Sequence, residues 1–163
     1  MFKKVLMGCL MALCAVSANA QFEAGKTYVN ASLSGFGTSF NKNNGFQFGI
    51  DGTAGHLIVD NVMLLGRLGY DHPGNSQNFL NIGVGARYYF VKTGISLGAG
   101  FSYEYGRVDG FSTNNFFFTP EVGYTFFLGE HVTIEPAAYV KMSFNDFKGT
   151  TTIGLRLGFG YFF

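Results

Sequence analysis

The sequence has little cysteine, and what it has lies at one end. Its 163 residues include two cysteines, Cys9 and Cys14, and no tryptophan. Beyond residue 14 the chain therefore has no thiol for a disulfide, for a nucleophile or for a cysteine-ligated metal. Packing and hydrogen bonds must hold together whatever fold the rest of the chain adopts.

Charge and long apolar runs are also scarce. Only 13% of the residues are charged, and 11 Lys and Arg nearly balance 10 Asp and Glu. No basic cluster marks a surface for nucleic acid or for anionic lipid headgroups. After residue 20, no apolar run approaches the roughly 18 residues that a membrane-spanning helix requires. A helical membrane protein is therefore excluded.

The first 20 residues have the pattern of an export signal. A positive start at Lys3 and Lys4 precedes an apolar stretch, and the sequence Ala-Asn-Ala at 18–20 provides a small-residue cleavage site. The apolar stretch is too short to cross a bilayer as a helix. We therefore predict a cleaved secretory signal peptide at 1–20 and a single domain at 21–163.

Glycine and aromatic residues are abundant instead, and they alternate. The chain contains 24 Gly, 20 Phe and 9 Tyr. In residues 95–106, Ile, Leu, Ala, Phe and Tyr alternate with Ser, Gly and Glu, and a similar alternation recurs in 150–163. A period of two is typical of a β-strand with one apolar face and one small or polar face.

This alternation extends along the chain and predicts eight strands. Most have close to the roughly 9–11 residues that a tilted strand needs to cross a bilayer. Short gaps near 58–61, 91–94 and 129–131 alternate with longer polar gaps, which indicates an up-and-down meander with both termini at the short-turn end. The predicted strands are 27–36, 46–57, 62–70, 79–90, 95–106, 116–128, 132–144 and 150–163, and the predicted long loops are 37–45, 71–78, 107–115 and 145–149.

The volume of the side chains decides which face points inward. The apolar faces carry about forty side chains, whereas the interior of an eight-stranded barrel is only just wide enough to be filled by side chains. The glycine-rich faces leave room there for a few long polar chains. We therefore expect an all-β fold, an eight-stranded antiparallel up-and-down transmembrane β-barrel whose aromatic face contacts outer-membrane lipid.

The charged residues within the predicted strands fall on the inward face. They comprise four acids and four bases, so they can pair in a buried, structural polar network. On the lipid face, a Lys or Arg at the midplane costs roughly 2–4 kcal/mol. The predicted lumen network consists of Asp51, Arg67, Arg87, Glu104, Glu121, Glu135, Lys141 and Arg156.

Two prolines also fall within predicted strands, at positions 120 and 136. Proline has no N–H for the hydrogen-bond ladder, and a closed barrel has no free edge at which to place it. We therefore expect Pro120 and Pro136 at β-bulges or near strand ends.

The C-terminal residues resemble an assembly signal. Phe163 ends the chain, and Tyr161 and Gly158 precede it in an alternating pattern that resembles the signal read by the outer-membrane assembly machinery. Leu157 departs from this pattern, because a polar residue is usual there. The resemblance implies that this machinery is a partner during biogenesis.

Two internal segments carry a wider resemblance. Residues 57–66 resemble a strand-turn-strand pattern that recurs in outer-membrane barrels. Residues 119–124 resemble the start of the third periplasmic hairpin in those barrels. With the C-terminal pattern, the whole of 21–163 resembles the porin-family outer-membrane β-barrel proteins of the OmpA/OmpX-like eight-stranded type. The resemblance implies location in the bacterial outer membrane. Its motifs encode architecture and carry no catalytic residues.

Candidate chemistry is sparse. A metal site needs several converging ligands, and the three histidines are spread along the chain, so we expect no metal and no cofactor. Barrels that modify lipids use Ser and His near the outer rim, but the loop residues here form no convincing pair. The histidines are His56, His72 and His131, and the loop candidates are Ser39, Ser76, His72 and Ser112.

These observations predict a non-enzymatic barrel, expected as a monomer, with a structural or surface-interaction role through its loops. The extracellular partner is open, and no nucleic acid is expected. A narrow channel for small solutes, or an OmpW-like lateral route for hydrophobic compounds, is the alternative. A lipid-modifying enzyme is a third hypothesis.

Overall fold

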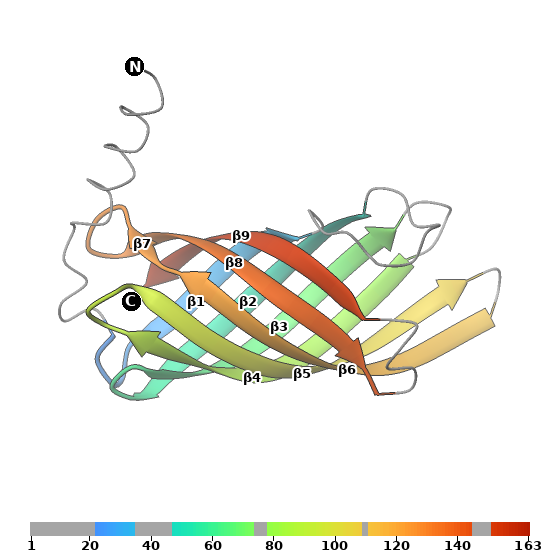
Figure 1. Cartoon of the computed structure of the whole chain (residues 1–163), viewed down its shortest axis with the longest axis horizontal. Coiled ribbons are helices and arrows are strands. Elements are labelled where there is room, and N and C mark those ends of the chain that lie inside the picture. Colours follow the sequence, from blue (N-terminus) through green and yellow to red (C-terminus); the bar gives the residue numbers. More distant parts are fainter. Residues whose placement is uncertain (1–21, 35–46, 74–77, 109–110, 145–150) are drawn as a thin grey trace, which may run out of the picture.

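The computed structural model describes residues 22–34, 47–73, 78–108, 111–144 and 151–163. Long tilted strands run between two ends of an elongated barrel (Figure 1). Within the described residues, no helix has the length and apolarity to span a membrane. The strand segments are β1 (Thr27–Ser34), β2 (Gln47–Val59), β3 (Val62–Pro73), β4 (Asn78–Phe90), β5 (Ile95–Val108), β6 (Phe111–Tyr124), β7 (Phe126–Phe127), β8 (Val132–Ser143) and β9 (Thr152–Phe162).

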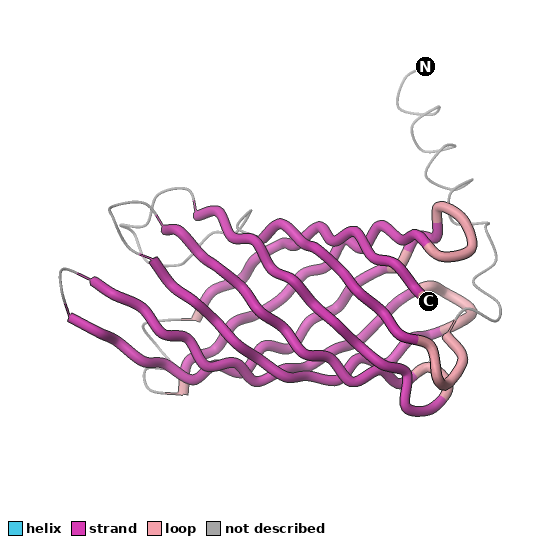
Figure 2. Tube along the Cα trace, turned by 180° about the vertical axis from the view of Figure 1, so that it is seen from behind, coloured by secondary structure: helices cyan, strands magenta, loops and turns pink. Residues whose placement is uncertain are grey.

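The sheet closes on itself. Its order is β6-β5-β4-β3-β2-β1-β9-β8-β7, and an additional antiparallel pairing of β6 with β8 joins the two ends. β7 continues β6 after Thr125, because both segments pair with β8 in one register, so the barrel has eight strands. Figure 2 shows the front and back walls crossing, as in a closed barrel. The predicted eight-stranded antiparallel barrel is confirmed.

The two ends of the barrel differ. We call the end with the turns 60–61, 91–94 and 128–131 the turn end, and the opposite end the loop end. The chain ends at the turn end with β9 (Figure 1). In the 60–61 turn, Asn61 has a φ of 68°, a left-handed conformation that Asn tolerates better than most residues. The predicted signal peptide and the predicted loops 37–45 and 145–149 lie outside the described residues.

The boundaries around the fifth and sixth strands were predicted wrongly. β5 continues to Val108 and β6 begins at Phe111, so most of the predicted loop 107–115 is strand. The sequence Ser-Thr-Asn-Asn at 112–115 is polar at every position, so it has no alternation to reveal a strand; pairing with residues 104–107 of β5 decides. As a result, the β5–β6 hairpin projects beyond its neighbours at the loop end (Figure 1).

Burial alternates along the strands, as the sequence predicts. In β9, residues 154, 156, 158, 160 and 162 are buried and the residues between them are exposed. The exposed face carries large apolar side chains, including Leu68, Val84 and Phe101. Exposed aromatic residues also mark both ends, as in interfacial girdles. They are Tyr88, Phe90, Tyr161 and Phe163 towards the turn end, and Tyr70, Tyr105 and Phe144 towards the loop end.

The prolines are accommodated differently from the prediction, which is wrong for both. Pro120 and Pro136 lie inside β6 and β8, with paired strand residues before and after them. Pro120 pairs with Ala99 of β5, and Pro136 pairs with Leu157 of β9. Between β6–β7 and β8 the ladder skips both proline rows without changing register. The missing N–H groups therefore interrupt this one seam and need no bulge.

Replacing Gly85 with alanine should destabilise the wall of the barrel. A Cβ there would lie 2.8 Å from the Ala99 carbonyl oxygen and 3.1 Å from the Gly100 Cα, both backbone atoms of β5. Because the ladder holds that backbone in place, we expect the free energy of unfolding to fall by about 1–3 kcal/mol. Urea unfolding in lipid vesicles, followed by far-ultraviolet circular dichroism, measures the change.

Gly66→Ala is the matched control. Gly66 is exposed on the outer face, and the nearest atom to its added Cβ would be the Ala54 carbonyl oxygen at 4.0 Å. Glycine weakens a strand interior, so this variant should be unchanged or more stable. Equal losses in the two variants would contradict close approach at Gly85 as the cause.

Candidate functional site

Glu121 on β6 is the centre of an ion network inside the barrel. Its carboxylate accepts hydrogen bonds from Arg87 Nη2 at 2.8 Å, from Arg156 Nη1 at 2.7 Å and from Arg67 Nη2 at 3.1 Å. These arginines come from β4, β9 and β3, so the contacts tie four strands together across the interior. Charge-assisted bonds of this kind are among the stronger ones in proteins.

Glu135 on β8 extends the network towards the turn end. It accepts hydrogen bonds from Arg87 Nη1 at 2.8 Å, from the Tyr28 hydroxyl at 2.6 Å and from Thr133 Oγ1 at 2.7 Å. The Arg87 guanidinium also lies over the rings of Tyr28 and Tyr89, 6.0 and 5.9 Å from their centroids. Arg87 is therefore held by two carboxylates and two aromatic rings.

Glycines in the same cross-strand rows make room for these long side chains. Gly98 lies directly between Arg87 and Glu121 in one cross-strand row. A Cβ on Gly98 would lie 2.9 Å from Glu121 Cγ. Gly158 stands beside Glu135 in the same way. The alternation of glycine with long polar residues on this face thus gives the network its space.

A second cluster lies nearer the loop end. Lys141 on β8 forms an ion pair with Glu104 on β5, and its Nζ lies 3.9 Å from Asp71 Oδ2 on β3. The same Nζ lies 4.3 Å from the centroid of the Phe117 ring. Asp51 accepts a hydrogen bond of 2.8 Å from Ser34 Oγ. In this cluster the acids outnumber the bases.

All eight charged residues of the predicted set lie on the inward face. Arg67 and Lys141 are partly buried. The other six are buried, namely Asp51, Arg87, Glu104, Glu121, Glu135 and Arg156. Asp71 also faces inward but was not predicted, because the third strand was expected to end at residue 70. It continues the phase of Arg67 and Gly69.

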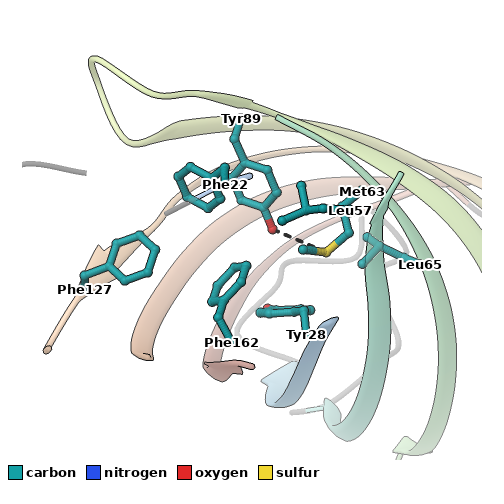
Figure 3. Packing of buried hydrophobic residues seen from close by; sticks show 8 residues of the cluster. All are labelled: Phe22, Tyr28, Leu57, Met63, Leu65, Tyr89, Phe127 and Phe162. Atoms are coloured by element: carbon teal, nitrogen blue, oxygen red, sulfur yellow. Dashed lines mark hydrogen bonds between the residues drawn. The ribbon is translucent and has the colours of Figure 1, made fainter. Parts of the chain in front are cut away.

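Sequence reasoning missed an apolar cluster inside the turn end. We call it the plug, and Figure 3 shows its side chains converging from several strands and from the N-terminal segment. Phe22 stacks on Tyr89 with 4.0 Å between ring centroids and meets the edges of Phe127 and Phe162 at 5.5 and 5.7 Å. The plug consists of Phe22, Tyr28, Leu57, Met63, Leu65, Tyr89, Phe127 and Phe162.

Backbone hydrogen bonds hold the N-terminal segment against the turn end. Asn61 N donates to Phe22 O at 2.9 Å, Gly25 N to Leu57 O at 2.8 Å, and Ala24 N to Asp60 Oδ1 at 2.9 Å. The segment therefore rests on the 60–61 turn and carries Phe22 into the plug. Residues 57, 63, 65 and 162 share the inward phase of the charged residues, and that was the available signal for the strand members of the plug.

The interior next to the ion network is closely filled. One cavity of about 10 Å³ borders Arg87, Glu121, Glu135 and Arg156, and another of about 20 Å³ borders Gly83, Gly85 and Gly100. A single water needs about 10–15 Å³. These spaces are therefore large enough for about one water each. The Nε–H groups of Arg67 and Arg156, which have no hydrogen-bond partner in the described structure, are candidates to donate hydrogen bonds to such waters.

The other candidate residues are placed without a shared centre. Among the described residues, no three His, Cys, Asp or Glu side chains group as a metal site. His131 stacks on Tyr161 at 5.5 Å, and His56 Nδ1 lies 3.3 Å from Thr27 Oγ1. Ser112 is exposed on β6, whereas Ser39, Ser76 and the side chain of His72 lie outside the described residues.

The residues of the expected assembly signal lie on the inner and outer faces of β9 and directly after its last residue. Gly158 is buried, and a Cβ there would lie 2.6 Å from Asn30 Nδ2. Tyr161 and Phe163 are exposed on the outer face and contact one another at 4.8 Å between ring centroids. Their part in assembly stays a prediction.

Solved structures share this architecture at low sequence identity. Neisserial surface protein A aligns with a TM-score of 0.67 and 16% identity over 84% of this chain and 98% of that chain. The N-terminal β-barrel domain of Pseudomonas aeruginosa OprF gives 0.66 and 15% over 86% and 98%. The Yersinia pestis outer membrane protein Ail in a phospholipid bilayer nanodisc gives 0.59 and 11% over 85% and 99%. These likenesses show the fold.

The comparison of whole sequences gives the family. A search of the curated proteins found no match. The family described as "Outer membrane protein beta-barrel domain" matches residues 7–163, which is nearly the whole chain. The closed barrel and its apolar outer face agree with this match. The chain belongs to the outer-membrane protein β-barrel domain family, and its place is the bacterial outer membrane.

Proposed function

We propose that this protein is a non-enzymatic, monomeric outer-membrane barrel with a structural or surface-interaction role, exported through cleavage of residues 1–20. The observation that carries the proposal is the filled interior. The plug occupies the turn end and the ion network around Glu121 occupies the middle, beside two cavities of about 10 and 20 Å³. Along the described strands such an interior leaves no wide path for a solute, and its charged groups serve to hold the wall together.

The specific contact surface is then the loop end. The described strands next to the predicted loops 37–45, 71–78, 107–115 and 145–149 end there, and the projecting β5–β6 hairpin stands farthest out (Figure 1). In outer-membrane barrels the strands commonly form the scaffold, and the extracellular loops carry the specific contacts. The partner that these loops contact is a molecule at the cell surface or beyond it. The assembly machinery, acting on Gly158, Tyr161 and Phe163, is the partner inside the cell envelope.

Planar-bilayer recording tests the closed interior. Pure protein should give no steady unit current, because side chains fill the barrel along the described strands. Refolded Neisserial surface protein A, which has a similar fold, is prepared and recorded in the same way to control for currents that arise from the preparation. Reproducible unit currents from this protein alone would replace the proposal with the narrow-channel alternative.

The interrupted seam between β6 and β8 favours one other candidate, a lateral route for small apolar molecules. Rows without ladder hydrogen bonds separate more readily than paired rows. Vesicles that contain the barrel and an enclosed hydrophobic-dye acceptor distinguish the two. Dye entry no faster than into empty vesicles supports the closed barrel, and protein-dependent entry supports the lateral route.

Unchanged lipid A in mass spectra with and without expression supports the non-enzymatic assignment.

A further inference from the structure

Four polar side chains form a ring at the loop end of the interior, apart from the ion network around Glu121. We call Ser34, Asp51, Asp71 and Asn81 the polar ring; they lie on the neighbouring strands β1 to β4. Ser34 Oγ donates to Asp51 Oδ2 at 2.8 Å, and the Asn81 amide donates to the Asp71 carboxylate. The ring therefore brings side-chain oxygen atoms from four neighbouring strands close together.

Two glycines explain why these side chains converge. Gly49 separates the ring members on β1 and β3 in one inward row, and Gly69 separates those on β2 and β4 in the next. A Cβ on Gly69 would collide with Asp51 Oδ1 and with both amide atoms of Asn81. The oxygen atoms of two strands therefore share the space above a residue that has no side chain.

The ring leaves one buried acceptor without a donor. Asn81 is 7% exposed, and its Oδ1 has no hydrogen-bond partner. The orientation of the amide follows from its neighbour, because an ionised carboxylate such as Asp71 only accepts hydrogen bonds, so Nδ2 must face it. Buried carbonyl oxygens are normally satisfied by a donor, a water or an ion. Asn81 Oδ1 therefore needs a partner, which is either a water or a bound ion.

The same region carries an excess of negative charge. Asp51, Asp71 and Glu104 are accompanied by one base, Lys141, which pairs with Glu104 and lies 3.9 Å from Asp71. Arg67, the next base towards the turn end, forms its ion pair with Glu121 of the ion network. Asp51, Asp71, Glu104 and Lys141 alone sum to a formal charge of −2, an excess that Arg67, which also interacts with Asp51, offsets in part. The ligand that complements this charge and a free carbonyl oxygen is a cation.

We propose that the polar ring binds a small cation that enters from the loop end, held by Asn81 Oδ1 and by the carboxylates of Asp51 and Asp71. Carboxylate and amide oxygens are ligands for hard cations such as Ca²⁺, and they also accept hydrogen bonds from ammonium groups. No three acidic, His or Cys side chains of the described chain make a metal site alone. With two carboxylates, the dissociation constant is therefore in the weak extracellular range, about 10⁻⁴–10⁻³ M.

Isothermal titration calorimetry of the 21–163 barrel, folded in detergent, tests the proposal. CaCl₂, MgCl₂ and methylammonium chloride are titrated separately. Tetramethylammonium chloride at the same ionic strength is the control, because it has no N–H donor and is too large for the ring. Saturable binding of CaCl₂ or MgCl₂ identifies a metal ligand, and binding of methylammonium alone identifies an ammonium ligand. Heats no greater than those of the control for all three overturn the proposal and leave water as the partner of Asn81.

Substitutions locate the binding. Asn81→Asp supplies a third carboxylate and should tighten binding of the cation about tenfold, whereas Asp51→Asn should weaken it about tenfold, because ligand charge sets affinity in such sites. Glu130→Gln removes one negative charge from an exposed turn at the other end and should leave the affinity unchanged. Equal affinities in all three variants overturn the proposal. If Asp51→Asn does not fold, the comparison of Asn81→Asp with Glu130→Gln decides.

Discussion

Replacing Glu121 with leucine should lower the free energy of unfolding by about 3–5 kcal/mol, as expected when one partner of a buried ion network is removed. Three guanidinium groups, those of Arg67, Arg87 and Arg156, converge on this one carboxylate. Without it, they repel one another in a closely filled interior, and of the three only Arg87 keeps an ion pair among the described residues, with Glu135. Urea unfolding in lipid vesicles, with circular dichroism as the signal, measures the loss.

Two controls separate this effect from loss of charge in general. Glu130→Gln, on an exposed turn, should change the free energy of unfolding by less than about 0.5 kcal/mol, as surface substitutions usually do. The double variant Glu121→Leu/Arg156→Leu should recover part of the loss, because it also removes a base whose ion pair was with Glu121. A single variant as stable as the parent would show that the network contributes nothing to the fold.

Replacing Phe22 with alanine should cost about 3–5 kcal/mol, the usual range for a buried Phe→Ala change that leaves a cavity. The ring is 3% exposed and packs against Tyr89, Phe127 and Phe162. Since Phe22 precedes the first strand, loss of its ring also weakens the attachment of the N-terminal segment, which then depends on its hydrogen bonds to the 57–61 region. The midpoint of urea unfolding should fall, and protease should cut the N-terminal segment sooner.

Phe144→Ala is the matched control for the plug. Phe144 is 63% exposed on the outer face, where lipid or detergent fills the space that its ring leaves. The loss should therefore be clearly smaller than for Phe22. Equal losses would mean that Phe22 contributes only general apolar contact and that the plug does not depend on the N-terminal segment.

Much of the barrel could be predicted from local sequence patterns. A period of two in residues 95–106 and 150–163 identifies strands, and side-chain volume identifies the inward face. The inward charges followed from that phase, because each residue's face depends only on its own strand. Residues 112–115 could not be assigned in this way, since Ser-Thr-Asn-Asn is polar on both faces and only pairing with β5 makes it strand.

The contacts inside the barrel could not be read in the same way. The alternation places Arg87 and Glu121 on the inward face, but the cross-strand register determines that both lie beside Gly98. Phe22 belongs to no periodic segment, so no pattern marks it as interior. Hydrogen bonds from the 60–61 turn place it there.

By itself, the sequence determined the number of strands, the lipid-facing and inward faces, and the set of charges on the inward face, because these depend on alternation and volume within single strands. Only the tertiary structure decided which charges meet at Glu121, how Phe22 closes the turn end, and that Ser34, Asp51, Asp71 and Asn81 form one ring. These contacts depend on the register at which a twisted sheet closes. That register is a property of all eight strands together.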